Sequence, residues 1–541
     1  MRPILVAVFL AVMPAVLGPS LAAEVPAGTR LAKEQVLRYR VMDQINTLDP
    51  QMIEEVDSHA VAANLFEGLA TGTEDGGIVP ALAEGWEISA DGLTYTFHLR
   101  DATWSDGQKV VADDLVYAWR RAVDPAIGSS YGYFLALGGI ENADAVLSGA
   151  MPPDGLGVTA PDAKTLVVKL ATRTPFFLSM LTQATLFPVP RHVIEKYGKD
   201  WTLVGHIVSN GAYTLKENQP GERLVIERNP LYWNDAKTVL NRVEFISVPE
   251  NGQALTRFLA GELDYTDIPR GRKQQMVGLV GDQMTIRPQL CTDYLSLNVS
   301  ETGPVALRDR RVRKALSLAI DRDLLVKSAL RDAGLPTFDF TPPYVHGFAA
   351  PDLPESHMSQ TERDAEAQRL MREAGYGPDH PLTLNLSIVR YESHQIMARV
   401  LKQMFRQKLG VNLVTTETEN SVLAERMHAK DYEIARTGWC GDYNEASTFL
   451  TQLASSTESG MAQNDAGYSN PEVDRLLREA REAEDSGPIY GEAERLIIED
   501  QPIIPLYFGV DTVAISSHLK NWPVNAVTVL WYAKDLYRTE D

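Results

Sequence analysis

The sequence has 541 residues, of which 44% are hydrophobic and 23% are charged, and its formal net charge is −21. This composition is that of a large globular protein and excludes a mainly disordered chain. At about 100–200 residues per domain, the chain is long enough for several units, each with its own core. The acidic excess argues against binding to nucleic acid or to an anionic membrane through a basic patch.

The N-terminus, MRPILVAVFLAVMPAVLGPSLAAEVPAG, has the pattern of a secretory signal peptide. An early arginine precedes an apolar stretch from Pro3 to Leu17, and small residues follow. This stretch is shorter than the roughly 20 residues that a membrane-spanning helix needs, which disfavours a membrane anchor. We therefore expect residues 1–23 to form a signal peptide, cleaved after Ala22 or Ala23. No cysteine lies near that point, so a soluble periplasmic protein without a lipid anchor is predicted.

The N-terminal half mostly alternates strand and turn patterns. LTYTFHLR (93–100) alternates apolar and polar side chains, and this period of two predicts a half-buried strand. VADDLVYAWRRAVDP (111–125) predicts a helix that ends at Pro125. Further strands are predicted at residues 165–170, 223–228 and 242–248.

After Cys291 the pattern becomes mainly helical, with apolar residues at the spacing of one helix face. Helices are predicted at residues 311–330, 394–410 and 470–485. Gly410 is a candidate C-cap, and Asn470 followed by Pro471 is typical of a helix start. A strand is predicted between these helices at residues 382–389. The fold class is therefore α/β.

The sequence contains only two cysteines, Cys291 and Cys440. In an oxidising compartment, a distant pair of this kind predicts one disulfide. Closing a loop of about 150 residues would stabilise the fold by about 5 kcal/mol in the chain-entropy description. The alternative is a catalytic thiol accompanied by a second cysteine without a role.

Several stretches resemble the periplasmic oligopeptide-binding proteins, which are the peptide receptors of bacterial ABC importers. They follow the family's order along essentially the whole mature chain. The stretches are NLFEGL (64–69), PALAEGWEIS (80–89), DGLTYTFHLRDATWSDGQKVVADDLVYAWRRAVDP (91–125), VSNGAYTL (208–215), RNPLYWNDAKTV (228–239), RVRKALSLAIDRD (311–323) and GWCGDYNEAS (438–447).

The resemblance implies a two-lobe periplasmic-binding-protein (Venus-flytrap) fold with an extra subdomain inserted in the first lobe. The two lobes would close over a ligand by a hinge motion. The expected first lobe comprises residues 24–66, 191–289 and 511–541, the inserted subdomain residues 67–190, and the second lobe residues 290–510.

The loop TGWCGDYNEAST (437–448) carries the main candidate residue. Asp442 matches the family residue that binds the ammonium group of a peptide by a charge-assisted hydrogen bond. An aspartate of this kind could instead only form a turn. Cys440 matches the family's disulfide partner for Cys291, so the bridge would brace this loop, in which Trp439 and Cys440 are further candidates for ligand contact.

Other candidates come from positions that line the ligand groove in the family. Glu54, Val56 and Tyr131 match groove residues, where a peptide main chain could be held as an added strand. They could equally be ordinary strand and loop residues. Arg436 and His394 match positions that help to neutralise ligand carboxylates, although His394 could also be a solvated residue at a helix start.

Three positions depart from the family pattern. Counting back from Cys440, a family arginine falls on Met427, with Arg426 beside it, and a groove tryptophan falls on Asn420. A tyrosine after IPLYF falls on Gly509. These changes put the preferred peptide length and side chains in doubt, and a receptor for murein (cell-wall) peptides is an alternative.

The predicted protein is thus a peptide receptor and not an enzyme. It is expected to be a monomer that delivers short peptides to permease subunits with separate ATPases. No cofactor and no metal site is expected, since the histidines lack metal-ligand spacing. A receptor for a non-peptide solute remains an alternative.

GSSYG (128–132) fits the G-x-S-x-G motif of serine hydrolases. However, a helix and not a strand is predicted before Ser130, which leaves a secreted hydrolase as a remote alternative.

Overall fold

In a computed structural model of the chain, the described residues are 23–42, 45–53, 55–73, 76–269, 272–331, 334–441, 443–455, 464–483, 485–523 and 531–540. The predicted ligand-contact residues Glu54 and Asp442 lie outside the described residues. So do residues 1–22 of the predicted signal peptide.

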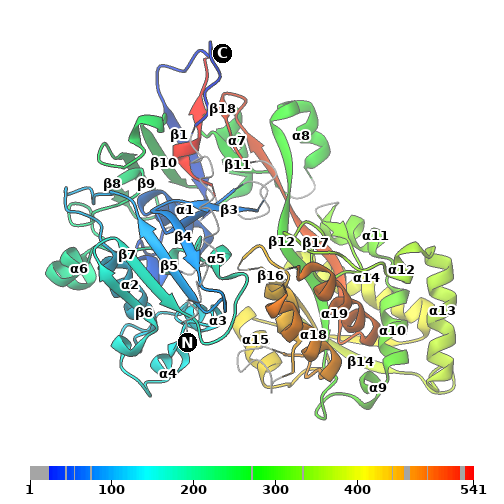
Figure 1. The fold of residues 1–541 in the computed structure, drawn as a ribbon. Helices are drawn as coiled ribbons and strands as arrows, with labels where there is room; N and C mark the ends of the chain where they lie inside the picture. The colour runs from blue at the N-terminus through cyan, green and yellow to red at the C-terminus, as the bar shows by residue number, and fades with distance from the viewer. Residues whose placement is uncertain are drawn as a thin grey trace, which may run out of the picture.

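The chain folds into two lobes that lie side by side (Figure 1). Buried apolar residues between positions 37 and 280, together with residues 513–536, form the cores of the first, which we call the N-lobe. Separate cores between positions 290 and 507 define the second, the C-lobe. Burial of apolar side chains within each lobe is the main stabilising contribution to its fold.

One sheet runs through both lobes. Its strands, in spatial order, are β15 (Asn412–Thr418), β14 (Thr383–Val389), β16 (Ile434–Cys440), β12 (Met284–Leu297), β17 (Ile503–Ile515), β11 (Tyr265–Asp267), β1 (Val36–Val41), β10 (Arg242–Ser247), β9 (Arg223–Arg228) and β8 (Tyr213–Gln219), with β13 (Leu335–Pro336) also paired to β17. The strands predicted at 223–228, 242–248 and 382–389 are confirmed as β9, β10 and β14.

The N-lobe also contains smaller sheets. These are β4 (Ala83–Ile88), β5 (Thr94–Leu99), β7 (Thr165–Lys169) and β6 (Val158–Asp162) in one sheet, and the pairs β2 (Ala70–Gly72) with β3 (Ile78–Pro80) and β18 (Leu519–Lys520) with β19 (Tyr537–Arg538). The predicted strands at 93–100 and 165–170 are confirmed as β5 and β7. On β5, Tyr95, Phe97 and Leu99 are buried while the residues between them are not, as the period of two predicts.

Helices cover both lobes (Figure 1). Those of the N-lobe are α1 (Val56–Leu65), α2 (Ala112–Val123), α3 (Tyr133–Leu137), α4 (Ala143–Leu147), α5 (Phe177–Met180), α6 (Arg191–Tyr197), α7 (Asn251–Leu259) and α8 (Lys273–Val280). Those of the C-lobe are α9 (Val305–Arg308), α10 (Arg310–Ala319), α11 (Arg322–Leu325), α12 (Pro354–His357), α13 (Gln360–Glu373), α14 (Glu392–Leu409), α15 (Asn420–His428), α16 (Ser447–Leu450), α18 (Pro471–Glu482) and α19 (Gly487–Asp500).

The prediction of one helix over residues 311–330 is wrong. The helix stops after α10, because Ile320 and Asp321 adopt extended backbone conformations. Asp321 caps α11 by accepting a hydrogen bond from the backbone N–H of Leu324. The break places the buried Arg322 guanidinium where it donates to the carbonyl oxygens of Pro505 (2.9 Å) and Ser317 (3.1 Å).

Three other helix predictions are confirmed, and their ends follow the expected capping rules. The helix predicted at 111–125 is α2, and those at 394–410 and 470–485 are α14 and α18. Gly410 ends α14 in the left-handed conformation (φ 71°), which glycine adopts without strain. Asn470 caps α18 by accepting from the N–H of Glu472.

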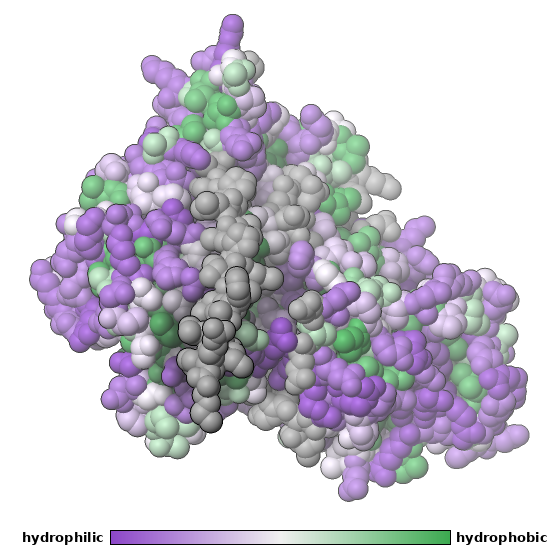
Figure 2. Space-filling view, in the orientation of Figure 1, coloured by the Kyte–Doolittle hydropathy of each residue, from purple (hydrophilic) through white to green (hydrophobic). Residues whose placement is uncertain are grey.

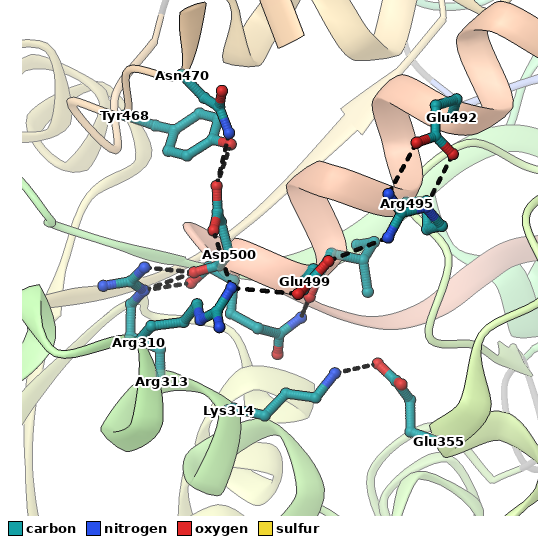
Figure 3. Close-up of polar contacts among 12 residues, drawn as sticks. Arg310, Arg313, Lys314, Glu355, Tyr468, Asn470, Glu492, Arg495, Glu499 and Asp500 are labelled. Carbon is teal, nitrogen blue, oxygen red and sulfur yellow. Dashed lines mark hydrogen bonds and ion pairs between the residues drawn. The ribbon is translucent and has the colours of Figure 1, made fainter. Parts of the chain in front are cut away.

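Asp500, at the end of α19, ties together three parts of the C-lobe (Figure 3). Its carboxylate accepts hydrogen bonds from the Tyr468 hydroxyl (2.7 Å) and the Asn470 amide (2.9 Å), and it lies 3.7 Å from the Arg310 guanidinium. Its carbonyl oxygen accepts from Arg313 Nε (2.9 Å). Because α10, α18 and α19 all meet here, these polar contacts fix the packing of the helices on one another.

The two lobes are joined by the pairing of β12 with β17. Residues 284–288 of β12 pair with 510–514 of β17, and residues 292–296 pair with 503–508. The register shifts between Pro288 and Thr292, so the ladder is interrupted where the chain passes from one lobe to the other.

The outer surface is largely hydrophilic in the view of Figure 2, with small apolar areas scattered between hydrophilic residues. In the part of the chain that the structure describes, no helix is both long and apolar enough to span a membrane.

Glu494 on α19 is a fully buried carboxyl group. Its oxygens accept hydrogen bonds from the backbone N–H groups of Phe340 (2.7 Å) and Thr341 (3.1 Å). Burial, and after it the charge of Asp339, raises the pKa of the Glu494 carboxyl to about 8. In the unfolded chain this pKa returns to an ordinary value near 4.5, so the folded protein binds the proton more tightly.

The free energy of unfolding should therefore fall as pH rises from about 5 to 8, by up to about 4 kcal/mol from this group. Glu494→Gln should remove most of this decline, because glutamine does not titrate. Its neutral amide oxygen still accepts both N–H groups. Urea unfolding at pH 5, 6.5 and 8 measures the effect, with Glu301→Gln, an exposed carboxylate, as the control. Equal pH slopes in wild type and Glu494→Gln would contradict it.

Candidate ligand-binding site

The predicted disulfide between Cys291 and Cys440 is present. The two residues face each other across the pairing of β12 and β16, with their Cα atoms 4.0 Å apart. Just beyond it, the Gly441 N–H donates to the carbonyl of Leu290 (2.7 Å). The strand end from which the candidate loop departs is therefore fixed to the C-lobe sheet.

A cavity of about 900 Å³ lies in the C-lobe beside β16, between the start of α14 and α15. Three of the predicted ligand residues, Arg436, Trp439 and His394, line it. The alternative of a solvated His394 is wrong, because its side chain is buried in the first turn of α14 and its Nδ1 lies 3.2 Å from the Val389 carbonyl oxygen. The structure thus places His394 in one cavity with Arg436 and Trp439, which follow it by more than 40 positions in the sequence.

The charge of Arg436 is shared within the protein. Its guanidinium donates to the carboxylate of Asp293 on β12 and to the Tyr507 hydroxyl (2.9 Å) on β17. Both side chains of the Arg436–Asp293 pair are less than a fifth exposed. A ligand carboxylate at Arg436 would therefore meet an ion pair and not an isolated cation.

The family arginine position at Met427 is filled here by an apolar side chain that lines the cavity and is 4% exposed. The neighbouring Arg426 does not replace that charge, because its Nε donates to Asp431 (3.0 Å) at the end of α15. The cavity therefore lacks the positive charge that the family arginine would supply at this position.

Tyr443 is a site residue that the sequence did not single out. It follows β16 in the C-lobe, yet its side chain, 3% exposed, packs into the core of the N-lobe. Its ring stacks on Phe176 (centroids 4.7 Å apart, interplanar angle 8°) and meets Phe134 edge-on at 6.5 Å. Its hydroxyl lies 2.9 Å from Ser447 Oγ, back on the C-lobe.

A neighbouring residue makes a second contact near the same place. The Asn444 side chain accepts a hydrogen bond from the His346 N–H (3.0 Å). The Asn444 amide nitrogen lies so close to Gly76 of the N-lobe that a Cβ atom added to Gly76 would be only 2.1 Å from it. Gly76 also has a positive φ (84°), so this approach requires glycine for two reasons. The loop after Cys440 therefore lies against both lobes.

The predicted groove residues of the N-lobe are placed differently from one another. Tyr131 packs against the N-lobe core, with its ring 6.4 Å from Phe134, which in turn contacts Tyr443. Val56 is 59% exposed and begins α1. Tyr131 thus belongs to the same aromatic contact as Tyr443, whereas Val56 offers an accessible position at a helix start.

A second cavity, of about 1000 Å³, lies in the N-lobe beside α2 and α6. Arg121 pairs there with Asp49 (2.5 Å), and Arg191 with Asp113 (3.3 Å). None of the predicted contact residues that the structure describes lines this cavity. The cavity beside β16 is therefore the candidate ligand site.

The surroundings of the possible nucleophiles do not match those of a hydrolase. Ser130 is exposed in turns that follow α2, and no strand precedes it as the G-x-S-x-G motif requires. Cys440 is bonded to Cys291. Within the described ranges, no group of three or more His, Cys, Asp or Glu side chains could hold a metal ion.

Comparison with known proteins gives full-length matches. Residues 77–461 match the family described as bacterial extracellular solute-binding proteins, family 5 Middle. The chain is 39% identical over 523 residues to the periplasmic murein peptide-binding protein MppA of Escherichia coli strain K12, covering 96% of each chain. In the same strain, it is 38% identical over 498 residues to the periplasmic oligopeptide-binding protein OppA, covering 91% of this chain and 90% of OppA. It is also 36% identical over 525 residues to the probable deoxycholate-binding periplasmic protein YgiS, covering 96% of each chain.

The fold agrees with a solved structure. The unliganded open form of MppA, a periplasmic murein tripeptide binding protein, superposes with a TM-score of 0.84 at 37% sequence identity. The match covers 95% of this chain and 99% of that chain. The predicted two-lobe α/β fold is thereby confirmed.

Tyr443→Ala should lower the free energy of unfolding by about 3 kcal/mol, because it removes a buried aromatic ring from the contact between the lobes. Tyr443→Phe keeps the ring and loses only the hydroxyl next to Ser447, so a change of about 1 kcal/mol is expected. Urea unfolding followed by tryptophan fluorescence measures both. If the alanine variant were no less stable than the phenylalanine variant, the ring would not hold the lobes together.

Proposed function

Since this chain belongs to family 5 of the bacterial extracellular solute-binding proteins, we propose that it is the peptide receptor of an ABC importer. It binds short peptides between its two lobes and delivers them to a membrane permease. The permease subunits work with separate ATPase subunits, and the receptor acts as a monomer in the periplasm after removal of its signal peptide.

One observation carries this proposal: the described residues on either side of Asp442 are anchored in different lobes. Cys440 is bonded to β12 of the C-lobe, and Tyr443 is packed in the N-lobe core. A carboxylate held between two such anchors is suited to bind the ammonium group of a peptide, because little conformational entropy is lost on binding.

The remaining candidates supply contacts to the rest of the peptide. Main-chain groups near Val56 and the side chains of Glu54 and Tyr131 would line the groove on the N-lobe side. Arg436, paired with Asp293, would meet a ligand carboxylate, with Trp439 and His394 in the same cavity. Main-chain recognition and a roomy cavity together give loose side-chain specificity.

Ligand capture requires the lobes to move, and the interruption of the β12–β17 ladder supports a hinge there. Lobe boundaries at 289/290 and 510/511 fit this interruption. An inserted subdomain at 67–190 is supported by the separate sheet of β4 to β7, although its apolar residues share the N-lobe core.

The ligand is bound and released unchanged. Ser130 lacks the strand that would present a nucleophile, and the Cys440 sulfur is engaged in a disulfide. This favours a receptor over a secreted hydrolase.

A narrower second candidate is a receptor for murein peptides. It is favoured by the similarity to MppA in sequence, at 39% identity, and in structure, with a TM-score of 0.84. The similarity to YgiS shows that the family also includes a protein named for a non-peptide ligand, so the ligand has to be identified directly.

Mass spectrometry of the ligands that co-purify with the protein tests the function. A ladder of short peptides is expected for the general receptor, and a single species containing diaminopimelate for the murein receptor. A non-peptide solute as the bound species would overturn the proposal.

Asp442→Ala should weaken binding of a tripeptide with a free N-terminus by about 3 kcal/mol, because the ligand ammonium would lose its charged partner. Isothermal titration calorimetry measures the change. The Nα-acetylated tripeptide is the matched control: it should bind wild type weakly and be unaffected by the substitution. Equal affinities of wild type and Asp442→Ala for the free peptide would remove Asp442 from the site.

A further inference from the structure

The cavity beside β16 contains an acidic group that the proposed function does not use. Asp465 lies in the segment before α18 and lines the cavity together with His428 of α15. Its side chain is 20% exposed, so the carboxylate is largely withdrawn from solvent but reachable from the cavity.

One oxygen of this carboxylate lacks a hydrogen-bond donor. Asp465 Oδ1 is buried and, among the described residues, receives no hydrogen bond. His428 Nε2 is 3.8 Å away, beyond hydrogen-bond distance, and an imidazole carries a charge only when protonated. The nearby Lys430 ammonium donates instead to the Asn464 carbonyl (2.5 Å).

The surroundings show that the negative charge is not well compensated. Burial raises the pKa of the Asp465 carboxyl, and the charges of His428 and Lys430 oppose the rise without cancelling it. A buried acceptor without a donor destabilises the folded protein, and more so if it is charged. A cationic group entering the cavity would meet the exposed part of the Asp465 side chain and stabilise the negative charge that its two oxygens share.

The wall around Asp465 suits a particular kind of cationic group. Leu423, Met427, Leu453 and Ile503 line the same cavity and present apolar surface. An aliphatic chain could pack on these residues while its terminal ammonium reaches the carboxylate, as lysine side chains do in proteins. An acidic side chain would instead be repelled by Asp465.

The other charged groups of the cavity leave this preference in place. Arg436 is paired with Asp293, and Glu392 at the start of α14 adds a second negative charge. The cavity therefore favours a cationic over an anionic ligand side chain.

We propose that Asp465 is a specificity-determining residue, which binds the ammonium group at the end of an aliphatic side chain of a bound peptide. This inference rests on the proposed function, since a peptide must first enter the cavity. Lysine and diaminopimelate residues both carry an ammonium group at the end of a methylene chain, and in diaminopimelate the carbon that bears it also carries a carboxylate.

The test compares peptides that differ only in this ammonium group. Tripeptides of alanine that carry lysine, norleucine or glutamate at position 2 or at position 3 are titrated calorimetrically into the full-length mature protein. At one of the two positions, wild type should bind the lysine peptide at least about tenfold more tightly than the norleucine peptide, and the glutamate peptide most weakly.

Asp465→Asn should reduce the lysine-to-norleucine ratio to about one, while the affinity for the norleucine peptide changes less than about twofold. Asp465→Glu, which keeps the charge, should retain a lysine preference. Glu425→Gln removes a carboxylate from the exposed face of α15 without altering the cavity lining, and it is the matched control. Thermal unfolding of each variant verifies that it is folded.

The outcomes separate this inference from the function on which it rests. If wild type binds none of the peptides, the peptide-receptor function fails. If wild type binds them but shows no lysine preference, or if Asp465→Asn keeps the preference, the role of Asp465 fails. A peptide with diaminopimelate in place of lysine distinguishes the two ligand sources: tighter binding than lysine identifies a murein peptide, and equal binding identifies general basic peptides.

Discussion

The antiparallel pairing of β12 with β17 is the constraint on which the rest of the architecture depends. These two long strands carry hydrogen bonds in both lobes, and all other strands of the large sheet are arranged on either side of them. Their ladder is interrupted between Pro288 and Thr292. The same pair of strands therefore joins the two lobes and is irregular where it passes between them.

The candidate site is built immediately beside this interruption. Cys291 lies on β12 at that point, and its bond to Cys440 fixes the end of β16 next to the interruption. The chain then leaves the C-lobe sheet and within three residues inserts Tyr443 into the core of the other lobe. The chain after Cys440 therefore contacts both lobes, as the proposed receptor would require in order to close on its ligand.

Much of the local structure could be predicted because its causes are local. The strand at β5 follows from alternation of apolar and polar residues, and the ends of α14 and α18 follow from Gly410, Asn470 and Pro471. The break after α10 could not be predicted in this way. Besides the local cap at Asp321, it is accompanied by a hydrogen bond from Arg322 to the carbonyl of Pro505, which is 183 positions away and belongs to β17. The burial of His394 could not be predicted from the sequence either, because it depends on how α14 packs and not on the neighbours of His394 in the sequence.

The sequence by itself determined the fold class, the pairing of the two cysteines and the family, because composition, residue spacing and the order of motifs are properties of the chain alone. Only the tertiary structure decided that Tyr443 belongs to the opposite lobe, that Asp293 shares the charge of Arg436, and that Asp465 lines the cavity beside β16. These features arise from contacts between residues far apart in the chain, such as the 143 positions between Asp293 and Arg436. No periodicity or spacing encodes such contacts, because they exist only once the strands have paired and the lobes have packed.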